Sequence, residues 1–362
     1  MRPLPPGLLR RQLVLGGMAG LAGLVSHMPA HALSAKPFLF PGDRGSHPDL
    51  RTEWWYITGQ AAAGNRSFGF QLTFFRKRVD GTQGMASRFA ARQLLFAHAA
   101  VTDVEGKKLW HDQRIARAGF DVAGAAEDDA RIKLRDWSLE RGADGSFQAR
   151  LRAADFALDL VCKPTQPVLL QGDKGLSRKG PEAAQASYYY SQPQLAVSGR
   201  IELRGQRFDT TAGKAWMDHE WSDDLLHQEA MGWDWIGMNL DDGSALTAFQ
   251  LRRADGTPLW DGGSFRAGSG ATYIAGKGET QFAARRYWTS PLSGAKYPVE
   301  WLVRTPADFY RVCAVLDNQE LDSRASTGAI YWEGLSDLID GNGRKVGRGY
   351  LEMTGYTKRL KL

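Results

Sequence analysis

Short runs in which apolar and polar residues alternate recur through most of the chain. Examples are RIKLRDWSLE from residue 131, GRIELRG from residue 199 and GRGYLEMTGY from residue 347. The runs are closed by Gly, Asp or Asn, and alternation with a period of two between such residues predicts antiparallel strands and hairpins. We therefore expect an all-β fold with little helix. The one helix that we expect is short and lies within residues 326–340.

The pattern also repeats itself along the chain. Trp54 precedes Phe70 by 16 positions, Trp233 precedes Phe249 by the same interval, and both phenylalanines open the sequence FQL. An Arg-containing run and the triplet Asp-Gly-Thr follow each FQL, and Asp-Gly is a strong hairpin signal. This repeat predicts two related β domains in tandem, each large enough for a closed or nearly closed barrel.

The predicted organisation has three parts: a leader at residues 1–35, an N-terminal barrel at 36–205 and a C-terminal barrel at 206–362. We place the boundary between the barrels in the Gly-containing stretch RGQRFDTTAGK. A long segment at 163–195 breaks the strand rhythm, and loops of this length are either functional or disordered. Its paired leucines and its run of three tyrosines favour packing, so we expect an ordered flap across a barrel mouth or the domain junction.

The leader has the features of an export signal. Arg10 and Arg11 precede the mildly apolar run LVLGGMAGLAGLV, small residues follow at Ala32 and Ala35, and no acidic residue is present. The paired arginines resemble the twin-arginine type, whose cargo crosses the membrane folded, and the general secretory route is the alternative. We expect a periplasmic or secreted product with no membrane span once the leader is removed.

Composition excludes several classes of protein. The chain has 362 residues, 43% of them apolar, so it can bury a large core. Its formal charge is +6, and Arg2, Arg10 and Arg11 of the leader account for three of these charges, so nucleic-acid binding gains no support. The only two cysteines, Cys162 and Cys313, cannot frame a disulfide-based fold. We expect buried free thiols, and the alternative in an oxidising compartment is one bridge between them.

The stretch KAWMDHEWSD, residues 214–223, combines two acids and a histidine between two tryptophans. Side chains alternate along a strand, so one face carries Ala215, Met217, His219 and Trp221, and the other carries Trp216, Asp218 and Glu220. His219 and the two acids then cannot share one cavity unless a bulge re-aims one of them. A catalytic triad is disfavoured, and we predict no metal site, because His219 and His227 match no standard ligand spacing.

Several stretches together resemble a known family. They are HPDLRTEWWYITG, SYYYSQP, GKAWMDHEWSD followed by GWDWIGMNLDDG, YWEG and GYLEMTGY, in this order along the chain. They resemble the lipocalin-like family of carotenoid 1,2-hydratases, also called hydroxyneurosporene synthases, and secreted AttH-like proteins. The resemblance implies two lipocalin-like β-barrel domains and affinity for a hydrophobic small molecule, either a lipid or an isoprenoid.

In the hydratase branch, an acid protonates an isoprenoid double bond and water captures the resulting carbocation. This chemistry needs a proton donor that a dry site keeps protonated, and aromatic faces beside the cation. The candidate donors here are Asp218, Glu220 and Asp234, and the His-x-Trp of that branch falls on His219 and Trp221. A structural alternative makes Asp218, His219 and Glu220 buried partners of arginines.

The candidate ligand-binding residues are aromatic. They are Trp54, Tyr56, Tyr189, Tyr190, Trp216, Trp221, Trp233 and Trp235. The hydratase branch also has an aromatic residue and an acid on a following strand, where this chain has Phe249 and Gln250. The absence of that acid counts against hydration of a carotenoid.

Two functions are left open by the sequence. One is an enzyme, a hydro-lyase or isomerase that acts by protonation, and the other is a non-catalytic periplasmic lipid carrier that works with the permease of an envelope ABC transporter. Serine-hydrolase activity is disfavoured because no G-x-S-x-G motif is present. Neither a P-loop nor a dinucleotide fingerprint occurs, so we expect no cofactor.

Overall fold

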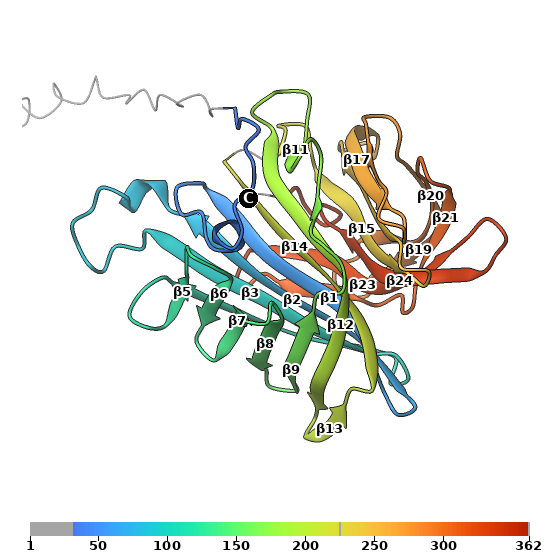
Figure 1. Cartoon of the computed structure of the whole chain (residues 1–362), viewed down its shortest axis with the longest axis horizontal. Coiled ribbons are helices and arrows are strands. Elements are labelled where there is room, and N and C mark those ends of the chain that lie inside the picture. Colours follow the sequence, from blue (N-terminus) through green and yellow to red (C-terminus); the bar gives the residue numbers. More distant parts are fainter. Residues whose placement is uncertain (1–31, 224–225, 361–362) are drawn as a thin grey trace, which may run out of the picture. The chain divides into compact units, whose positions relative to one another are not determined.

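The computed structural model describes residues 32–223 and 226–360, which belong to one compact unit. These residues fold almost entirely into β-strands and include no α-helix, which confirms the predicted fold class (Figure 1). Two short 3-10 helices are η1 (Gly42–Arg44) and η2 (Asp80–Thr82). No described helix has the length and apolarity that crossing a membrane requires. The predicted export signal lies outside the described residues, apart from its last few positions.

The first sheet contains fourteen strands, and all their pairings are antiparallel. They are β1 (Thr52–Ala63), β2 (Arg66–Arg78), β3 (Gln93–Asp103), β4 (Lys108–Arg117), β5 (Ala123–Ala125), β6 (Arg131–Leu134), β7 (Trp137–Arg141), β8 (Phe147–Arg152), β9 (Phe156–Lys163), β10 (Leu169–Leu170), β11 (Leu176–Arg178), β12 (Ala186–Leu203), β13 (Gln206–Asp209) and β14 (Ala212–Ser222). The main path runs β4-β3-β2-β1-β14-β12-β9-β8-β7-β6-β5. Strand β6 contacts β3 and β4, so the sheet curls back on itself as a nearly closed barrel.

The second sheet contains ten strands and is also antiparallel. They are β15 (Gly232–Leu240), β16 (Ala245–Arg252), β17 (Pro258–Arg266), β18 (Thr272–Ala275), β19 (Gln281–Thr289), β20 (Lys296–Arg304), β21 (Phe309–Ala314), β22 (Glu320–Ser323), β23 (Ala329–Ile339) and β24 (Lys345–Met353). The main path runs β18-β17-β16-β15-β24-β23-β21-β20-β19. The chain thus forms two antiparallel β units, as the sequence predicts, and the first of them is nearly barrel-shaped.

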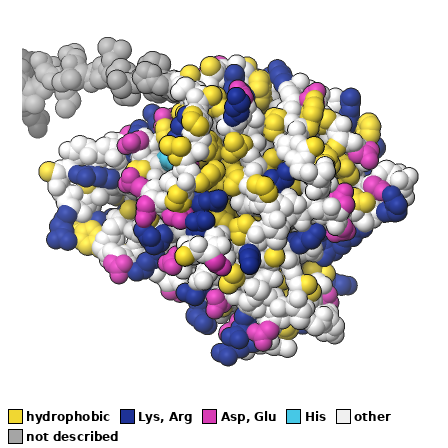
Figure 2. Space-filling view, viewed as in Figure 1, with side chains coloured by type: hydrophobic (Ala, Val, Ile, Leu, Met, Phe, Trp, Pro, Cys, Tyr) yellow, Lys and Arg dark blue, Asp and Glu magenta, His cyan; other side chains and the backbone are white. Residues whose placement is uncertain are grey.

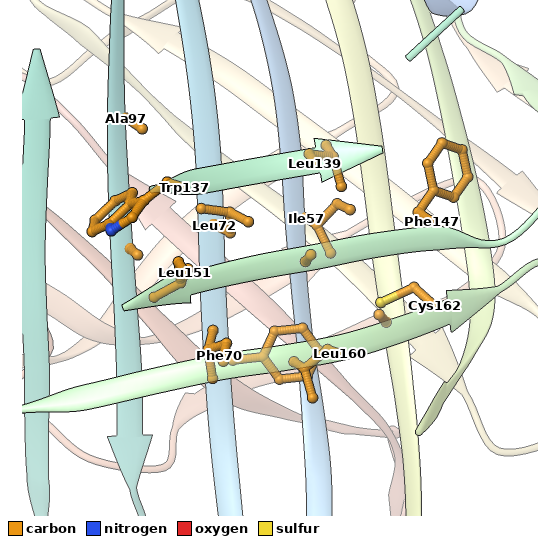
Figure 3. Packing of buried hydrophobic residues seen from close by; sticks show 14 of the residues in the cluster. Ile57, Phe70, Leu72, Ala97, Trp137, Leu139, Phe147, Leu151, Leu160 and Cys162 are labelled. Atoms are coloured by element: carbon orange, nitrogen blue, oxygen red, sulfur yellow. The ribbon is translucent and has the colours of Figure 1, made fainter. Parts of the chain in front are cut away.

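The interior of the first barrel is filled by large apolar side chains. Strands β7, β8 and β9 cross over β1 and β2, and Trp137, Leu139 and Leu160 pack against Ile57 and Leu72 (Figure 3). All five of these side chains are at most 1% exposed. A small barrel of this kind has an interior that side chains can fill completely. The first barrel therefore leaves its centre closed to a ligand.

A second core lies inside the other sheet, and a third core joins the two sheets. Ile236, Trp301 and Leu351 belong to the second core. In the third core, Tyr56 and Trp216 of the first sheet pack with residues of the second sheet, where β1 contacts β24 and β14 contacts β15. The strands at this junction are buried on both faces, which explains why β14 and β16 have long buried runs instead of a clean alternation.

Two details differ from the sequence-based expectations. The predicted short helix within 326–340 is wrong, because β23 occupies Ala329–Ile339 and pairs with β21, β22 and β24. The chain changes sheet between β14 and β15, whereas the sequence analysis divides the domains at residue 205. Gly205 has a φ of +80° and forms the tight turn between β12 and β13, so this Gly marks a hairpin within the first sheet.

The long segment at 163–195 is ordered and lies against both sheets. Strands β10 and β11 pair with β12, and the tyrosine run belongs to β12 itself. The Trp260 indole donates to the Arg178 carbonyl at 2.9 Å, and Gln166 donates to the Gly243 carbonyl at 2.7 Å, so the segment is fastened to the second sheet. The two cysteines are free thiols on different sheets; Cys162 is buried, as expected, whereas Cys313 is only partly buried.

Candidate functional site

A cavity of about 90 Å³ lies between the facing surfaces of the two sheets, and we call it the inner chamber. Its aromatic walls are Trp54, Tyr56, Phe75, Tyr189, Trp233, Trp235, Phe249 and Tyr331. Five charged or ionisable side chains also line it: Lys179, Asp218, Glu220, Glu333 and Glu352. Among the described residues, four carboxyl groups but only one ammonium group line the cavity. Ionising all four acids in an enclosed apolar site would cost much free energy.

Strand register places the acids of the first sheet in this chamber. Tyr56 lies opposite Asp218, and Trp54 lies opposite Glu220, across the β1–β14 pair. Residues directly opposite one another in an antiparallel pair point to the same face of the sheet. Tyr189 of β12 lies opposite Glu220 on the other side of β14 and completes the same face. The predicted alternation within KAWMDHEWSD is therefore confirmed, without a bulge.

Asp218 is the acid most firmly held in the chamber. Its Oδ1 accepts hydrogen bonds from the Ser191 hydroxyl at 2.5 Å and the Trp216 indole at 2.7 Å, and its Oδ2 accepts one from the Tyr189 hydroxyl at 2.8 Å. Burial raises the pKa of Asp218 to about 7, although these three hydrogen bonds favour the ionised form. Near neutral pH this carboxyl group can therefore carry a proton and release it.

We expect the stability of the protein to depend on pH through Asp218. Its pKa is raised on folding, so between about pH 4 and pH 7 the folded state keeps a proton that the unfolded chain has released. This contribution to stability is present at low pH and is lost as pH rises through 7. The side chain of Asp218→Asn cannot titrate. Between pH 4 and pH 8 the free energy of unfolding of the wild type should therefore fall by up to about 4 kcal/mol more than that of this variant. Chemical denaturation at several pH values measures the difference, and parallel profiles would contradict it.

Two more acids face the chamber from the second sheet. Glu333 of β23 and Glu352 of β24 lie directly opposite each other in register. Glu333 is 2% exposed, and its Oε1 has no hydrogen-bond partner among the described residues. Burial, reinforced by the charge of Glu352, raises the pKa of Glu333 well above its ordinary value. Burial also raises the pKa of Glu352 to about 7, with Asp218 and Glu220 adding to the shift. Such a carboxyl pair can hold a shared proton.

The single cation of the chamber comes from the long segment before β12. The Lys179 ammonium lies 3.0 Å from the Glu220 carboxylate, which also accepts a hydrogen bond from Ser187 at 2.5 Å. The same ammonium lies 4.6 Å from the ring centre of Tyr189 and 4.4 Å from that of Phe249. A carboxylate and two aromatic faces are the surroundings in which a buried ammonium group finds favourable electrostatic contacts. Glu220 is therefore the paired acid of the chamber, whereas Asp218 forms no ion pair with any cation in residues 32–223 and 226–360.

His219 lies on the opposite face of β14, inside the first barrel. Its Nε2 lies 3.0 Å from Glu53 Oε1, its Nδ1 lies 3.2 Å from the Tyr190 hydroxyl, and its ring stacks on Trp55. Burial lowers the pKa of His219 to about 4, so the ring is neutral at neutral pH. His219 and Trp221 do share a face, as predicted, but that face is turned away from the inner chamber.

The other predicted site residues divide in the same way. Asp234 lies inside the second barrel, where Arg252 at 2.7 Å, Gln250 at 2.8 Å and Tyr356 at 2.9 Å bind its carboxylate. Of the predicted aromatic residues, the chamber walls contain Trp54, Tyr56, Tyr189, Trp233 and Trp235. Trp216 stands behind the wall and orients Asp218, whereas Tyr190 and Trp221 pack beneath the N-terminal segment. The structure thus brings Asp218 and Glu220 to the chamber and places His219 and Asp234 elsewhere.

A cluster of His47, Glu53 and His219 has ligand atoms within 4.8 Å of one another, the geometry of a candidate metal centre. The atoms that could bind a metal already form hydrogen bonds or ion pairs with other residues. Arg76 donates to Glu53 Oε2 at 2.7 Å, and His47 bridges Glu53 at 2.7 Å and Asp43 at 3.0 Å. Although burial opposes it, hydrogen bonds from the two histidines and the charge of Arg76 hold the pKa of Glu53 below its ordinary value. We interpret the cluster as a buried ion network that fastens the N-terminal segment to the barrel.

Three acidic or basic residues of the chamber were not predicted from the sequence: Lys179, Glu333 and Glu352. A signal for the two glutamates was present, because Tyr331 and Glu333 in YWEG, and Tyr350 and Glu352 in GYLEM, each have the period of two that puts an acid beside an aromatic residue. No signal in the sequence indicates that Lys179 turns inward.

Comparisons with known proteins identify the family. The model of the AttH-like family matches residues 31–356, so the chain belongs to this family. No protein among the curated sequences matches the chain.

Solved structures show the same fold. A crystal structure from Nitrosomonas europaea, described as a candidate AttH, is 45% identical and has a TM-score of 0.84, covering 90% of this chain and 99% of its own. Kievitone hydratase from Nectria haematococca has a TM-score of 0.69 at 11% identity, covering 89% and 94% of the two chains. CghA, crystallised with Sch210972, has a TM-score of 0.52 at 12% identity, covering 84% and 89%.

Proposed function

We propose that this AttH-like protein binds an apolar molecule between its two barrels and protonates a carbon–carbon double bond of that molecule, leading to hydration or isomerisation. One observation carries the proposal. Burial raises the pKa of the Asp218 carboxyl group to about 7, and this group has no cationic partner in the part of the chain that the structure describes and faces a chamber walled by aromatic side chains. General acids act best when their pKa is near the working pH. An enclosed aromatic site is also the environment in which a carbocation is stabilised.

The proposed reaction begins with a proton transfer from Asp218 to one alkene carbon. The π electron pair forms the new C–H bond, and the other carbon becomes a carbocation beside the rings of Trp235 and Tyr189. The oxygen of a water molecule then forms the C–O bond, and the proton that this oxygen loses passes to a carboxylate. Alternatively, a carbon next to the carbocation loses a proton to the carboxylate. The C–H electron pair then forms a double bond at a new position, and the product is an isomer.

The Glu333 and Glu352 pair is the proposed acceptor of that second proton. The charge of Asp218 contributes to the raised pKa of Glu352, so the two groups lie close enough to interact across the chamber. The free Oε1 of Glu333 is the polar atom that can bind and orient the attacking water. Return of the proton from this pair to Asp218, directly or through water, completes the cycle without any cofactor.

The substrate that suits these walls is an apolar alkene, for which we propose an isoprenoid or an unsaturated lipid. Eight aromatic side chains line the inner chamber, and aromatic surfaces favour unsaturated hydrocarbon over polar groups. The proposed place of action is the periplasm or the exterior of the cell, on the basis of the leader at residues 1–35. Cell fractionation with the intact chain and with a chain that lacks residues 1–35 tests this location.

Isotope labelling tests the proposed function. We expect the purified protein to convert at least one of geraniol, farnesol and squalene into an alcohol that carries ¹⁸O when the reaction is run in H₂¹⁸O, as detected by mass spectrometry. Fluorescence transfer from tryptophan to cis-parinaric acid should report binding of a polyene in the chamber. A Thr73→Trp variant fills the chamber and should abolish both signals, because Thr73 is part of its wall.

Thr211→Trp is the matched control, because Thr211 is exposed and lies outside the chamber. It should retain both signals. A reaction in D₂O detects isomerisation, because the alkene then gains deuterium from the solvent. If cis-parinaric acid binds but neither an ¹⁸O-labelled alcohol nor a deuterated alkene forms, the lipid carrier is favoured over the enzyme. Binding that survives Thr73→Trp would place the ligand elsewhere and contradict the proposal.

A further inference from the structure

A second cavity adjoins the inner chamber and leads outward. This outer chamber has a volume of about 230 Å³ and shares five wall residues with the inner one: Trp54, Phe75, Trp233, Tyr331 and Glu352. Its walls also include Leu94 and Phe96 of β3 and Ile115 of β4, and Ile115 is 39% exposed. The two cavities therefore share part of their wall, and the outer one reaches the exposed side chain of Ile115.

A group of exposed apolar residues stands at the end of the first sheet where the β2–β3 connection and the segment after β4 meet. Its members are Met85, Phe89, Phe120 and Val122, which are 48%, 66%, 46% and 37% exposed. The rings of Phe89 and Phe120 stack with their centres 5.4 Å apart. Figure 2 shows basic and hydrophobic side chains next to one another at this end of the molecule. Exposed aromatic side chains grouped in this way mark interaction surfaces.

Two arginines belong to the same surface. The guanidinium carbon of Arg117 lies 4.2 Å from the ring centre of Phe120 and 5.6 Å from that of Phe89, and that of Arg88 lies 5.3 Å from Phe120. Among residues 32–223 and 226–360, no carboxylate forms an ion pair with either arginine. Arg117 Nη1 is buried and has no hydrogen-bond partner within the same ranges. We call these six residues the basic-aromatic patch.

The patch continues the wall of the outer chamber. Arg117 lies directly opposite Leu94 across the β3–β4 pair, and Ile115 lies opposite Phe96. These four side chains share one face of the sheet, because paired residues point the same way. Leu94, Phe96 and Ile115 line the outer chamber, so an apolar surface runs from the patch to the opening without leaving this face.

We propose that the basic-aromatic patch docks the protein on an anionic phospholipid surface, so that an apolar ligand passes between the lipid and the outer chamber without crossing water. The exposed guanidinium group of Arg88 can bind a lipid phosphate through two parallel hydrogen bonds, and the partly buried Arg117 adds a second positive charge beside it. The stacked phenylalanines supply apolar side chains that enter the interfacial region of a bilayer.

Charge favours a lipid surface over a second copy of the chain or another protein. Two uncompensated positive charges beside each other would repel their counterparts in a symmetric dimer. An anionic surface instead attracts each nearby arginine and neutralises both. The inference does not depend on catalysis, because docking requires none of the carboxyl groups of the inner chamber.

Sedimentation with lipid vesicles tests the docking. We expect the protein to bind vesicles that contain phosphatidylglycerol and to bind pure phosphatidylcholine vesicles at least about tenfold more weakly, with the difference shrinking at high salt. The Arg88→Gln/Arg117→Gln variant and the Phe89→Ser/Phe120→Ser variant should each weaken binding to the anionic vesicles by about tenfold. Their melting temperatures, measured in the same buffer, confirm that they fold.

Two control variants make the result specific. Phe309→Ser removes an equally exposed phenylalanine, 53% exposed, from β21 of the second sheet and should leave vesicle binding unchanged. Asp218→Asn should also bind vesicles like the wild type, so failure of the proposed chemistry and failure of the docking are separate outcomes. Equal binding to both vesicle types, an equal loss in Phe309→Ser, or patch-dependent dimerisation without lipid overturns the proposal.

Discussion

Asp218→Asn is expected to lower the rate of hydration or isomerisation by about 10²–10⁴-fold while leaving ligand binding nearly unchanged, because it removes the proton donor and little else. Asparagine has the size of aspartate and keeps one carbonyl oxygen for Ser191 and Trp216, which both bind Oδ1. Its amide NH₂ then faces the Tyr189 hydroxyl, which can accept a hydrogen bond as well as donate one. The variant should therefore fold and keep the shape of the chamber.

The measurement combines the rate of ¹⁸O incorporation with the affinity for cis-parinaric acid, each expressed per folded molecule. Asp234→Asn is the matched control, because it makes the same change in a buried acid that points into the second barrel. That control should lose stability through its Arg252 partner but keep its rate per folded molecule. If Asp218→Asn retains the wild-type rate, or loses rate only in proportion to unfolded protein, Asp218 is not the donor.

The alternation of side chains was sufficient to predict the fold class and half of the site. In β14 the period of two correctly separates Asp218 and Glu220 from His219, and the structure keeps this separation over the whole strand. Alternation within one strand is a local property of the backbone, so a single sequence contains it. Which face of a strand packs against the other sheet depends on contacts between residues distant in sequence. For that reason His219 and Asp234 were candidates beside Asp218.

The internal repeat correctly predicts two antiparallel β units, but equivalent residues of the two copies face different ways. Phe70 packs inside the first barrel, whereas Phe249 lines the inner chamber. The reason is register: Tyr56 lies opposite Thr73, whereas the corresponding Trp235 lies opposite Phe249 itself. A change in hairpin length between the two copies moves FQL to the other face, as any odd shift in register does. A sequence repeat therefore predicts the number of β units more reliably than it predicts the face on which a given side chain lies.

The second pair of acids was missed because it depends on long-range pairing. Glu333 and Glu352 lie 19 positions apart in sequence and become neighbours only when β23 pairs with β24. They reach the chamber only because that sheet packs on the face of the first sheet that carries Asp218. Lys179 has the same dependence, since it enters the chamber from a segment with little regular structure. A single sequence shows the alternation that puts each glutamate beside an aromatic residue, but it does not show which distant strands pair.

Arg76→Ala is expected to destabilise the fold by about 3–5 kcal/mol, the cost of leaving a buried carboxylate without its cation. Arg76 is 2% exposed and Glu53 is 1% exposed, and their side chains meet at 2.7 Å. The same guanidinium group also donates to Gln93 at 2.8 Å and to the carbonyls of His47 and Leu50 at 2.8 and 2.9 Å. Its removal therefore breaks the hydrogen bonds between the N-terminal segment and β2, and it leaves Glu53 buried without a cation.

Arg78→Ala is the matched control, because Arg78 lies two positions further along β2 and pairs with the half-exposed Asp80 at 2.8 Å. Exposed pairs contribute about 0–1 kcal/mol, so this variant should stay close to the wild type in a urea titration. Adding Glu53→Gln to Arg76→Ala should recover part of the loss, since the stranded charge is then gone. No recovery would mean that Arg76 acts through packing and its backbone contacts. Equal losses in Arg76→Ala and Arg78→Ala would show that the buried ion network contributes no more than a surface pair.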